Sequence, residues 1–356
     1  MLAVIRSLAK AGFRVISISN GKAGGYLSRY SWKKFDFSDY PGDKWGAIAE
    51  IAKREKVSCI YCHLESTKFN IYKSLEDKIK NEEIILIPPD PSQIKFITFK
   101  DNIIKLAKTI DIPVPESIFL TRENLDLIHS EEIKNSLPLF AKVSSEIDIP
   151  PGPENRSLVI RTQADLEKLK EFVLKRGKII LQHFIEGQGY GIGGLFYEGE
   201  PIAVGGHLRL REAFKFGGPS TYCVSKINKE ALEYALRIMR ELKYSGFGMI
   251  EFKISKSGKV FLMEINPRIW GTLQAYINAG LDLPLIAYKV FVEKDTSCIK
   301  NLSFKENVKT IFLWEDIRAV LDQYRNLQKF FEITKSFFSI LFGMTKEGTL
   351  AVSYTH

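Results

Sequence analysis

The sequence predicts an α/β domain followed by an α+β domain, and two observations carry this prediction. In residues 1–90, helical patterns alternate with short apolar runs, which is typical of a small, mostly parallel sheet with helices over it. In the second half, alternating runs are joined by short turns at YEGEP and at residues 255–258, which indicates antiparallel hairpins.

Length and composition set the limits of the prediction. The chain has 356 residues with 45% hydrophobic and 26% charged residues, so at about 150 residues per domain it holds two or three domains and is neither disordered nor fibrous. Its apolar runs fall short of the roughly 20 residues of a membrane span, so no stable membrane insertion is expected. Arg6 and Lys10 interrupt the apolar N-terminal stretch, which is wrong for a signal peptide. The expected location is the cytoplasm.

The net charge of +9 is compatible with nucleic acid, a membrane surface or an anionic substrate as the partner. No aromatic and basic recognition motif supports nucleic acid, so none is expected as a partner. Four cysteines are too few for a disulfide scaffold in a chain of this size. Cys59 and Cys62 form a C-x-x-C pair inside VSCIYCHL, which indicates a buried strand rather than a redox or zinc site.

The α/β domain opens on a helix at residues 2–12, followed by the strand RVISIS, so the first strand of such a unit is absent. A helix at 45–56, the strand VSCIYCHL, a helix at 70–80 and the strand EIILIPP complete the alternation.

The α+β domain begins with a helix at 100–110 and the strand LPLFAKV. It continues with a loop rich in Pro, Gly and Ser (SSEIDIPPGPENRS), the strand LVIRT, a helix from Gln163 and the strand KIILQHFI. A hairpin from YGIGGLFYEGE to PIAVGGHLRLRE, a flexible loop at GGPS (217–220), a helix at 228–246 and a hairpin at 247–267 follow.

Two Phe-rich helices are expected at 316–328 and 330–342. For the aromatic residues of the last helix we favour packing on the core over a dimer interface or a membrane surface.

The hairpin at 247–267 carries the strongest group of polar residues. Glu264 and Asn266 alternate along one strand and therefore share a face, and Glu251 lies on the partner strand. Carboxylate and amide oxygens suit Mg²⁺, and Arg268, further along the same face, could grip a phosphate bound to the metal. The alternative is a solvated strand face with a surface ion pair.

Further cations are candidates for anion binding. Lys142 lies in an otherwise apolar strand, where a lysine is unexpected unless it meets a negative group, and Lys100 precedes a helix. His207, Arg209 and Arg211 alternate along one strand and share a face. On an outer face this pattern is ordinary, whereas opposite a phosphate site it would bind the anionic part of a substrate. Neither a nucleophile elbow nor a Walker A loop is present.

The segment MIEFK…FLMEINPRIWG resembles the ATP-grasp superfamily, and specifically its carbamoyl-phosphate-synthase-like carboxylate-amine ligases. The resemblance covers residues 94–290: FKDNIIKLAKTIDIPVPES is similar to the opening segment, LFAKV to the first lysine strand and IILQHFIEGQGYGIGGLF to the hinge beneath adenine. It implies a pre-ATP-grasp α/β domain at 1–92 and an ATP-grasp domain of two α+β subdomains at 93–300. Within the ATP-grasp domain, a lid subdomain is expected at about 115–186. A C-terminal helical segment is expected after the domain, at 301–356.

The resemblance also implies roles for residues. Glu251, Glu264 and Asn266 would hold one or two Mg²⁺, with Mn²⁺ as an alternative ion, and Arg268 would stabilise the transferred phosphoryl group. Lys100 and Lys142 would contact the ATP phosphates, and Arg209 and Arg211 would bind the acyl phosphate or the carboxylate of the acceptor. The hinge would consist of Gln182, His183, Phe184, Ile185 and Glu186, with backbone groups of His183 and Ile185 facing adenine and Glu186 or a neighbour reaching the ribose.

The implied activity is an ATP-dependent ligase that activates a carboxylate as an acyl phosphate and joins it to an amine, releasing ADP and phosphate. Its partners would be a small-molecule carboxylate and amine, and a homodimer is left open. The alternative is a non-catalytic ATP-binding subunit of a biosynthetic complex, which the prolines of SSEIDIPPGPENRS and the absent first strand favour.

Overall fold

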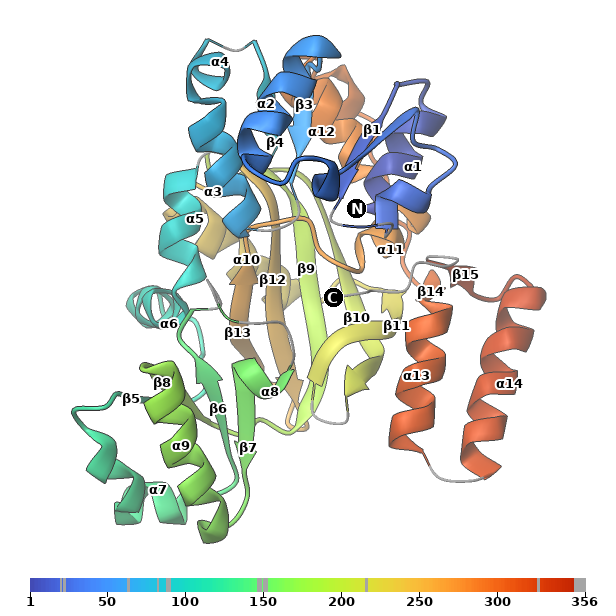
Figure 1. The fold of residues 1–356 in the computed structure, drawn as a ribbon. Coiled ribbons are helices and arrows are strands. Elements are labelled where there is room, and N and C mark those ends of the chain that lie inside the picture. Colours follow the sequence, from blue (N-terminus) through green and yellow to red (C-terminus); the bar gives the residue numbers. More distant parts are fainter. Residues whose placement is uncertain are drawn as a thin grey trace. The chain divides into compact units, whose positions relative to one another are not determined.

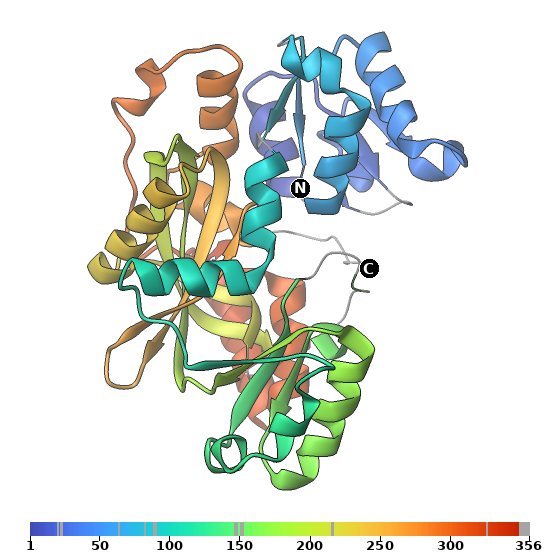
Figure 2. The same cartoon turned by 90° about the vertical axis from the view of Figure 1, so that its left-hand side faces the viewer.

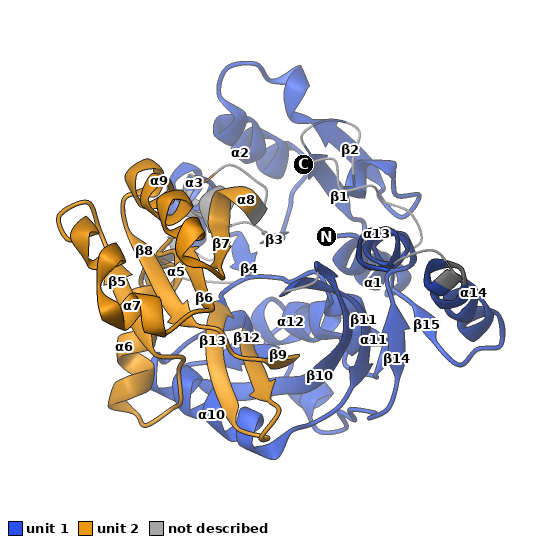
Figure 3. Ribbon diagram, turned by 90° about the horizontal axis from the view of Figure 1, so that it is seen from below, with its two compact units in different colours: residues 1–91, 190–249, 266–356 blue, residues 92–189, 250–265 orange. Residues whose placement is uncertain are grey.

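The computed structural model describes residues 1–19, 21, 24–62, 65–81, 83–87, 91–145, 149, 153–214, 217–324 and 327–348 (Figure 1). The chain divides into two compact units, coloured separately in Figure 3. Unit 1 comprises residues 1–91, 190–249 and 266–356, and unit 2 comprises residues 92–189 and 250–265. The predicted mixture of α/β and α+β structure is confirmed.

The N-terminal part of unit 1 has the predicted alternation of helices and strands. Its strands form two separate parallel pairs, β1 with β2 and β3 with β4. Sequence patterns missed β2, because Lys33 and Lys34 interrupt its apolar residues, and the helix expected at 70–80 is divided at Leu75. The elements are α1 (Leu2–Lys10), β1 (Ile16–Ser19), η1 (Gly24–Leu27), β2 (Lys33–Asp36), η2 (Phe37–Asp39), α2 (Lys44–Arg54), β3 (Cys59–Tyr61), α3 (Glu65–Ser74), α4 (Glu76–Lys80) and β4 (Ile85–Ile87).

Unit 2 contains a four-stranded sheet in the order β5-β8-β6-β7, whose neighbouring strands are antiparallel. Helix α9 covers one face of this sheet (Figures 1 and 2), where Leu169 and Val173 pack with Leu139, Ala141 and Leu181 in one buried cluster. The elements are α5 (Pro91–Thr98), α6 (Lys100–Thr109), β5 (Ser117–Leu120), η3 (Leu125–His129), α7 (Glu131–Asn135), β6 (Leu139–Val143), α8 (Pro153–Arg156), β7 (Ser157–Ile160), η4 (Gln163–Asp165), α9 (Leu166–Arg176) and β8 (Ile179–His183).

The largest sheet has the order β13-β12-β9-β10-β11-β14-β15. The predicted hairpins are both present: β9 pairs antiparallel with β10, and the turn from β12 to β13 is closed by a hydrogen bond from the Gly258 N–H to the Ser255 carbonyl. The strands are β9 (Gly187–Tyr197), β10 (Glu200–Phe214), β11 (Gly217–Ser225), β12 (Gly246–Ser255), β13 (Val260–Asn266), β14 (Lys309–Ile311) and β15 (Lys346–Glu347).

The prediction of a flexible loop at GGPS is wrong. Gly217 is paired with Phe214 and Ser220 with Glu212, so these residues begin strand β11. Turn-prone residues fit here because Gly217 and Gly218 have φ values of +138° and +100°, which glycine adopts without strain.

The remaining helices of unit 1 are α10 (Lys229–Glu241), α11 (Leu273–Asn278), α12 (Leu283–Phe291), η5 (Ser297–Ile299), α13 (Leu313–Gln323) and α14 (Leu327–Leu341). The main core of unit 1 joins distant parts of the chain, among them Leu8, Leu195, Phe247, Trp270 and Phe312. Over the described ranges, no helix combines the length and the apolar character needed to cross a bilayer.

The last helix corrects one further prediction. Phe337 and Phe338 of α14 and Phe342 just after it are exposed, so these aromatic residues do not pack on the core. The physical reason is that α14 turns polar residues toward the rest of unit 1.

Candidate functional site

The start of helix α6 is held by a buried polar network in unit 2. The Asp101 carboxylate accepts hydrogen bonds from the Ser144 hydroxyl at 2.6 Å and the Lys178 ammonium at 2.7 Å. The backbone N–H of Lys100 donates to the Ser144 carbonyl at 2.8 Å. Burial opposes the charged form of Asp101, but the bonds from Lys178 and Ser144 lower its pKa below the ordinary value. The network therefore fixes the backbone on which Lys100 is mounted.

Two of the predicted cations meet strand β13 at adjacent positions. The Lys100 ammonium lies 3.6 Å from the Glu264 carboxylate, and the Lys142 ammonium donates to the carbonyl of Met263 at 3.0 Å. Lys142 belongs to β6 and is buried, and its contact is a backbone carbonyl; the negative group that its apolar surroundings predicted stays a prediction. Unit 2 thus brings together two cations and a carboxylate that the sequence had singled out separately.

The predicted magnesium ligands lie on neighbouring strands. Glu251 is on β12 and Glu264 is on β13, and these strands are adjacent in the sheet. Asn266 is the last residue of β13, and its side-chain oxygen accepts a hydrogen bond from Arg268 at 3.0 Å. In the part of the chain that the structure describes, no group of three or more His, Cys, Asp or Glu residues could hold a metal ion. Carboxylate and amide oxygens are the kinds of ligand that Mg²⁺ prefers, and the assignment of Glu251, Glu264 and Asn266 to a metal site stays a prediction.

The predicted hinge begins inside the sheet of unit 2. Gln182 and His183 are the last residues of β8, and the His183 N–H donates to the Glu116 carbonyl at 3.0 Å, so this amide is engaged within the protein. The Gln182 side chain is buried and donates to the Ser117 hydroxyl at 2.9 Å. Its side-chain oxygen has no hydrogen-bond partner among the described residues. An unsatisfied buried carbonyl is costly, which makes this oxygen a candidate acceptor for a ligand.

The hinge segment then passes close to strand β12. The Lys253 ammonium lies 5.4 Å from the centre of the Phe184 ring, and Glu186 forms an exposed ion pair with Lys256 at 2.6 Å. A Cβ atom at Gly187 would lie 2.0 Å from the carbonyl oxygen of Ile254, so only glycine permits this approach of the two backbones.

The arginines of β10 have partners within unit 1. Arg209 donates to Glu212 at 3.1 Å and to the Gly218 carbonyl at 3.0 Å, whereas Arg211 pairs with the buried Asp316 and with Glu332. The β10–β11 register shifts between Arg209 and Arg211, which interrupts the simple alternation assumed from the sequence. Burial raises the pKa of Asp316, although the Arg211 guanidinium acts in the opposite direction.

His207 lies in the core of unit 1. Its Nδ1 is 3.0 Å from the Tyr276 hydroxyl, and burial, together with the neighbouring Arg209, lowers its pKa to about 3. It is therefore neutral at physiological pH. The partners Asp101, Ser144, Tyr276 and Asp316 were not singled out from sequence, because they contact their partners only through the tertiary fold.

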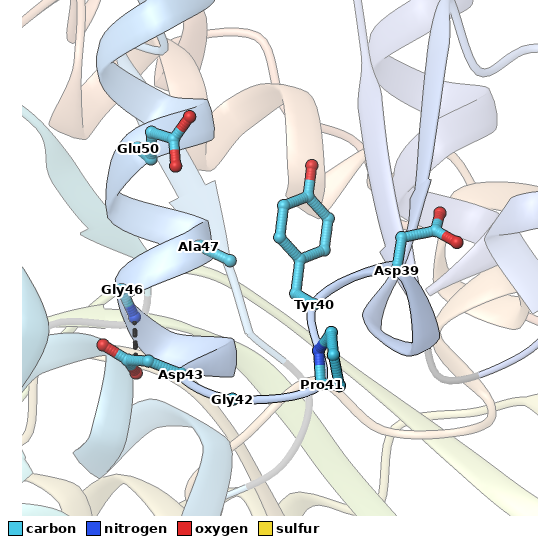
Figure 4. Close-up of a pocket in the computed structure, with 8 residues that line it drawn as sticks. All are labelled: Asp39, Tyr40, Pro41, Gly42, Asp43, Gly46, Ala47 and Glu50. Atoms are coloured by element: carbon cyan, nitrogen blue, oxygen red, sulfur yellow. Dashed lines mark hydrogen bonds between the residues drawn. The ribbon is translucent and has the colours of Figure 1, made fainter.

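A separate pocket of about 450 Å³ lies in unit 1, where η2 leads into α2 (Figure 4). Asp39, Asp43 and Glu50 line it, and Asp43 is held by the Gly46 N–H at 2.9 Å. Three carboxylates would repel the phosphates of a nucleotide, so we do not assign this pocket to ATP.

The chain has the fold of ATP-grasp proteins, and part of its sequence matches an ATP-grasp family model. Residues 175–311 match the family described as ATP-grasp in the biosynthetic pathway with Ter operon. The D-alanine–D-alanine ligase of Aquifex aeolicus is 26% identical over 179 residues, which represent 47% of this chain and 57% of that ligase. The match thus spans little more than half of the relative.

Solved structures with the same fold share few identical residues. The biotin carboxylase domain of Hydrogenobacter thermophilus 2-oxoglutarate carboxylase, solved with MgADP and bicarbonate, has a TM-score of 0.66 at 16% identity, over 86% of this chain and 71% of that one. An ADP complex of N5-carboxyaminoimidazole ribonucleotide synthetase has a TM-score of 0.64 at 14% identity, over 90% and 82% of the two chains. At such identities these structures support the fold alone.

Proposed function

We propose that this chain is an ATP-dependent ligase that activates a carboxylate as an acyl phosphate and joins it to an amine. The observation that carries the proposal is the approach of Lys100 and Lys142 to consecutive residues of β13, Glu264 and Met263. Cations held beside a carboxylate ligand are what phosphoryl transfer requires, because the reaction concentrates negative charge on phosphoryl oxygens. The similarity to a D-alanine–D-alanine ligase supports the same reaction class.

In the proposed reaction, a substrate carboxylate oxygen bonds to the γ-phosphorus of ATP while the bond to the bridging oxygen of ADP breaks. The amine then attacks the acyl carbon, phosphate leaves and the amine loses a proton. Lys100 and Lys142 neutralise ATP phosphates, and Arg268 stabilises the transferred phosphoryl group. Mg²⁺, when bound, polarises the phosphates, and Glu251, Glu264 and Asn266 are its proposed ligands. No protein nucleophile is required, since the carboxylate is already reactive.

The hinge is the proposed adenine site. Because the His183 N–H is engaged by Glu116, we assign the adenine contacts to the Gln182 side-chain oxygen and to backbone groups around Ile185. Glu186 is the proposed ribose ligand. Arg209 and Arg211 stay candidates for the acyl phosphate or the acceptor carboxylate, and binding at Arg211 would compete with Asp316 and Glu332. A cytoplasmic location and a homodimer also stay predictions.

The test is an ADP-release screen over pairs of carboxylates and amines, including amino acids, with Mg²⁺. The proposal expects ADP release that needs both substrates and is abolished in Glu264→Gln, while the matched control Glu171→Gln, at an exposed position of α9, keeps full activity. Failure of ATP to bind at millimolar Mg²⁺ would contradict the proposal. ATP binding without turnover or acyl phosphate for any pair would favour the alternative, a non-catalytic ATP-binding subunit.

A further inference from the structure

Helix α14 makes polar contacts with the rest of unit 1 and has large apolar side chains exposed to solvent. Glu332 accepts a hydrogen bond from the buried Arg211 guanidinium at 2.5 Å, and the Ser336 hydroxyl donates to Asp316 at 3.2 Å. These residues lie one turn apart, so they form one stripe of the helix. The polar stripe of α14 thus faces the protein, and it is fixed there by charged hydrogen bonds.

The outward side of α14 is apolar. Its large exposed side chains are Phe331, Phe337, Phe338 and Leu341, and Phe342 and Met344 follow just beyond the helix; all six have 49% to 76% of their surface accessible. The rings of Phe338 and Phe342 stack with centroids 6.0 Å apart. Figures 1 and 3 show α13 between β11 and α14, so α14 is the outer layer of this part of unit 1. A contiguous apolar patch of this kind marks a surface that binds something.

The charges on this segment indicate the partner. Between residues 327 and 347 the sequence has three lysines, Lys329, Lys335 and Lys346, and two acidic residues, Glu332 and Glu347, and Lys346 donates to the Asn278 carbonyl at 2.9 Å. Glu332 pairs with Arg211, and Lys335 is exposed at the apolar side, one turn before Phe338 and Ser339. Two copies of this face would bring cations together without an acidic group of α14 to receive them. An anionic surface is complementary to it.

We propose that the outward face of α14 docks on an anionic phospholipid surface. The side chains of Phe337, Phe338, Leu341 and Phe342 enter the interfacial layer, and Lys335 meets lipid phosphates. With 15 residues, α14 is shorter than the roughly 20 residues of a membrane span, so the helix lies on the bilayer and does not cross it. The Arg211 and Asp316 contacts keep the polar stripe on the protein while the apolar side is inserted.

The test is flotation of the full chain with vesicles of phosphatidylcholine alone or mixed with phosphatidylserine. We expect flotation with the anionic vesicles only, and a decrease as salt is raised, because exposed charges are screened. The double variant Phe338→Glu/Leu341→Glu should bind about tenfold more weakly, and Lys335→Glu should lose the preference for anionic lipid. The matched control is Leu127→Glu, an exposed leucine in η3 of unit 2, which should float like the parent chain.

Because the altered residues are exposed, the variants should fold, which circular dichroism and a thermal melt verify. Equal binding to both vesicle types, or no flotation of the folded parent chain, would overturn the proposal. The proposal would also be overturned if mass photometry shows that the parent chain is a dimer and the Phe338→Glu/Leu341→Glu variant is a monomer. The outward face of α14 would then bind a second copy of the chain. ADP release measured without vesicles should be unchanged in these variants, so the result is independent of the proposed ligase activity.

Discussion

The Lys100 ammonium lies 3.6 Å from the Glu264 carboxylate, which joins the first residue of α6 to strand β13 within unit 2. The pair is partly accessible, with side-chain exposures of 13% and 30%. Partly accessible ion pairs contribute little to stability, so selection for folding alone does not explain this one. The proposed roles of Lys100 at a nucleotide phosphate and of Glu264 at a metal ion would account for it.

The Glu264→Gln variant should separate binding from stability. We expect its free energy of unfolding to change by less than about 1 kcal/mol, because a partly exposed ion pair is screened by solvent. Its Mg²⁺-dependent affinity for ATP should fall by about tenfold or more, since a charged metal ligand is lost. Calorimetric titration of ATP with and without Mg²⁺ measures this effect. If Glu264→Gln binds ATP with Mg²⁺ as tightly as the parent chain and the control Glu171→Gln do, Glu264 is not a ligand of the metal.

Asp101 should act by positioning Lys100. The Asp101→Asn variant keeps the shape of the side chain but weakens the bond to Lys178, so we expect a loss of about 1–2 kcal/mol in the free energy of unfolding. The affinity of Asp101→Asn for ATP should fall together with its stability. The variant Lys178→Met removes a partner of Asp101 that lies outside the proposed site, so it tests whether the loss of stability alone accounts for the loss of ATP affinity. Urea unfolding and ATP titration on the same samples compare the two effects. Equal ATP affinity in Asp101→Asn and the parent chain would refute the positioning role.

His207 should make unit 1 sensitive to acid. Its pKa is lowered from 6.5 to about 3 in the folded protein, so the unfolded chain binds a proton between these pH values and the folded one does not. Stability should therefore fall as pH falls through this window, by about 1.4 kcal/mol per pH unit from this group. His207→Gln should flatten the slope in urea unfolding followed at several pH values. His129→Gln, at an exposed site, is the control and should leave the slope as it is.

The Arg211–Asp316 pair should be strongly coupled. Arg211→Met leaves the buried Asp316 carboxylate without its cation and should cost about 3–5 kcal/mol, whereas Asp316→Leu should cost less because Arg211 keeps Glu332, and the double variant should cost less than the sum of the two. The exposed pair Arg240–Glu200, at side-chain exposures of 52% and 65%, is the matched comparison and should show a coupling below about 1 kcal/mol. Chemical unfolding of both double-mutant cycles tests this expectation. Additive effects at Arg211 and Asp316 would argue against a buried ion pair.

The sequence predicted most helices and strands of both units because their apolar periodicity is local. Strand β2 was not predicted, because Lys33 and Lys34 break its apolar pattern. The segment GGPS was wrongly predicted to be a loop, because its pairing with β10 depends on residues outside the segment. In the candidate site, residue types singled out Lys100, Lys142 and Glu264 individually. Asp101, Ser144 and Lys178 carry no such local pattern, as their hydrogen bonds link residues far apart in sequence. The roles in catalysis and the domain boundaries at 92 and 300 stay predictions.

The core of unit 1 has a consequence for the time at which the chain can fold in the cell. Leu8 of α1 and Phe312, just before α13, belong to one buried cluster. Helix α1 contacts α12, so a ribosome that adds roughly 5–20 residues per second makes this partner on the order of tens of seconds after α1 has emerged. Throughout that interval an apolar helix stays accessible to chaperones and to neighbouring nascent chains. The yield of native protein should thus depend on translation speed and on chaperone supply.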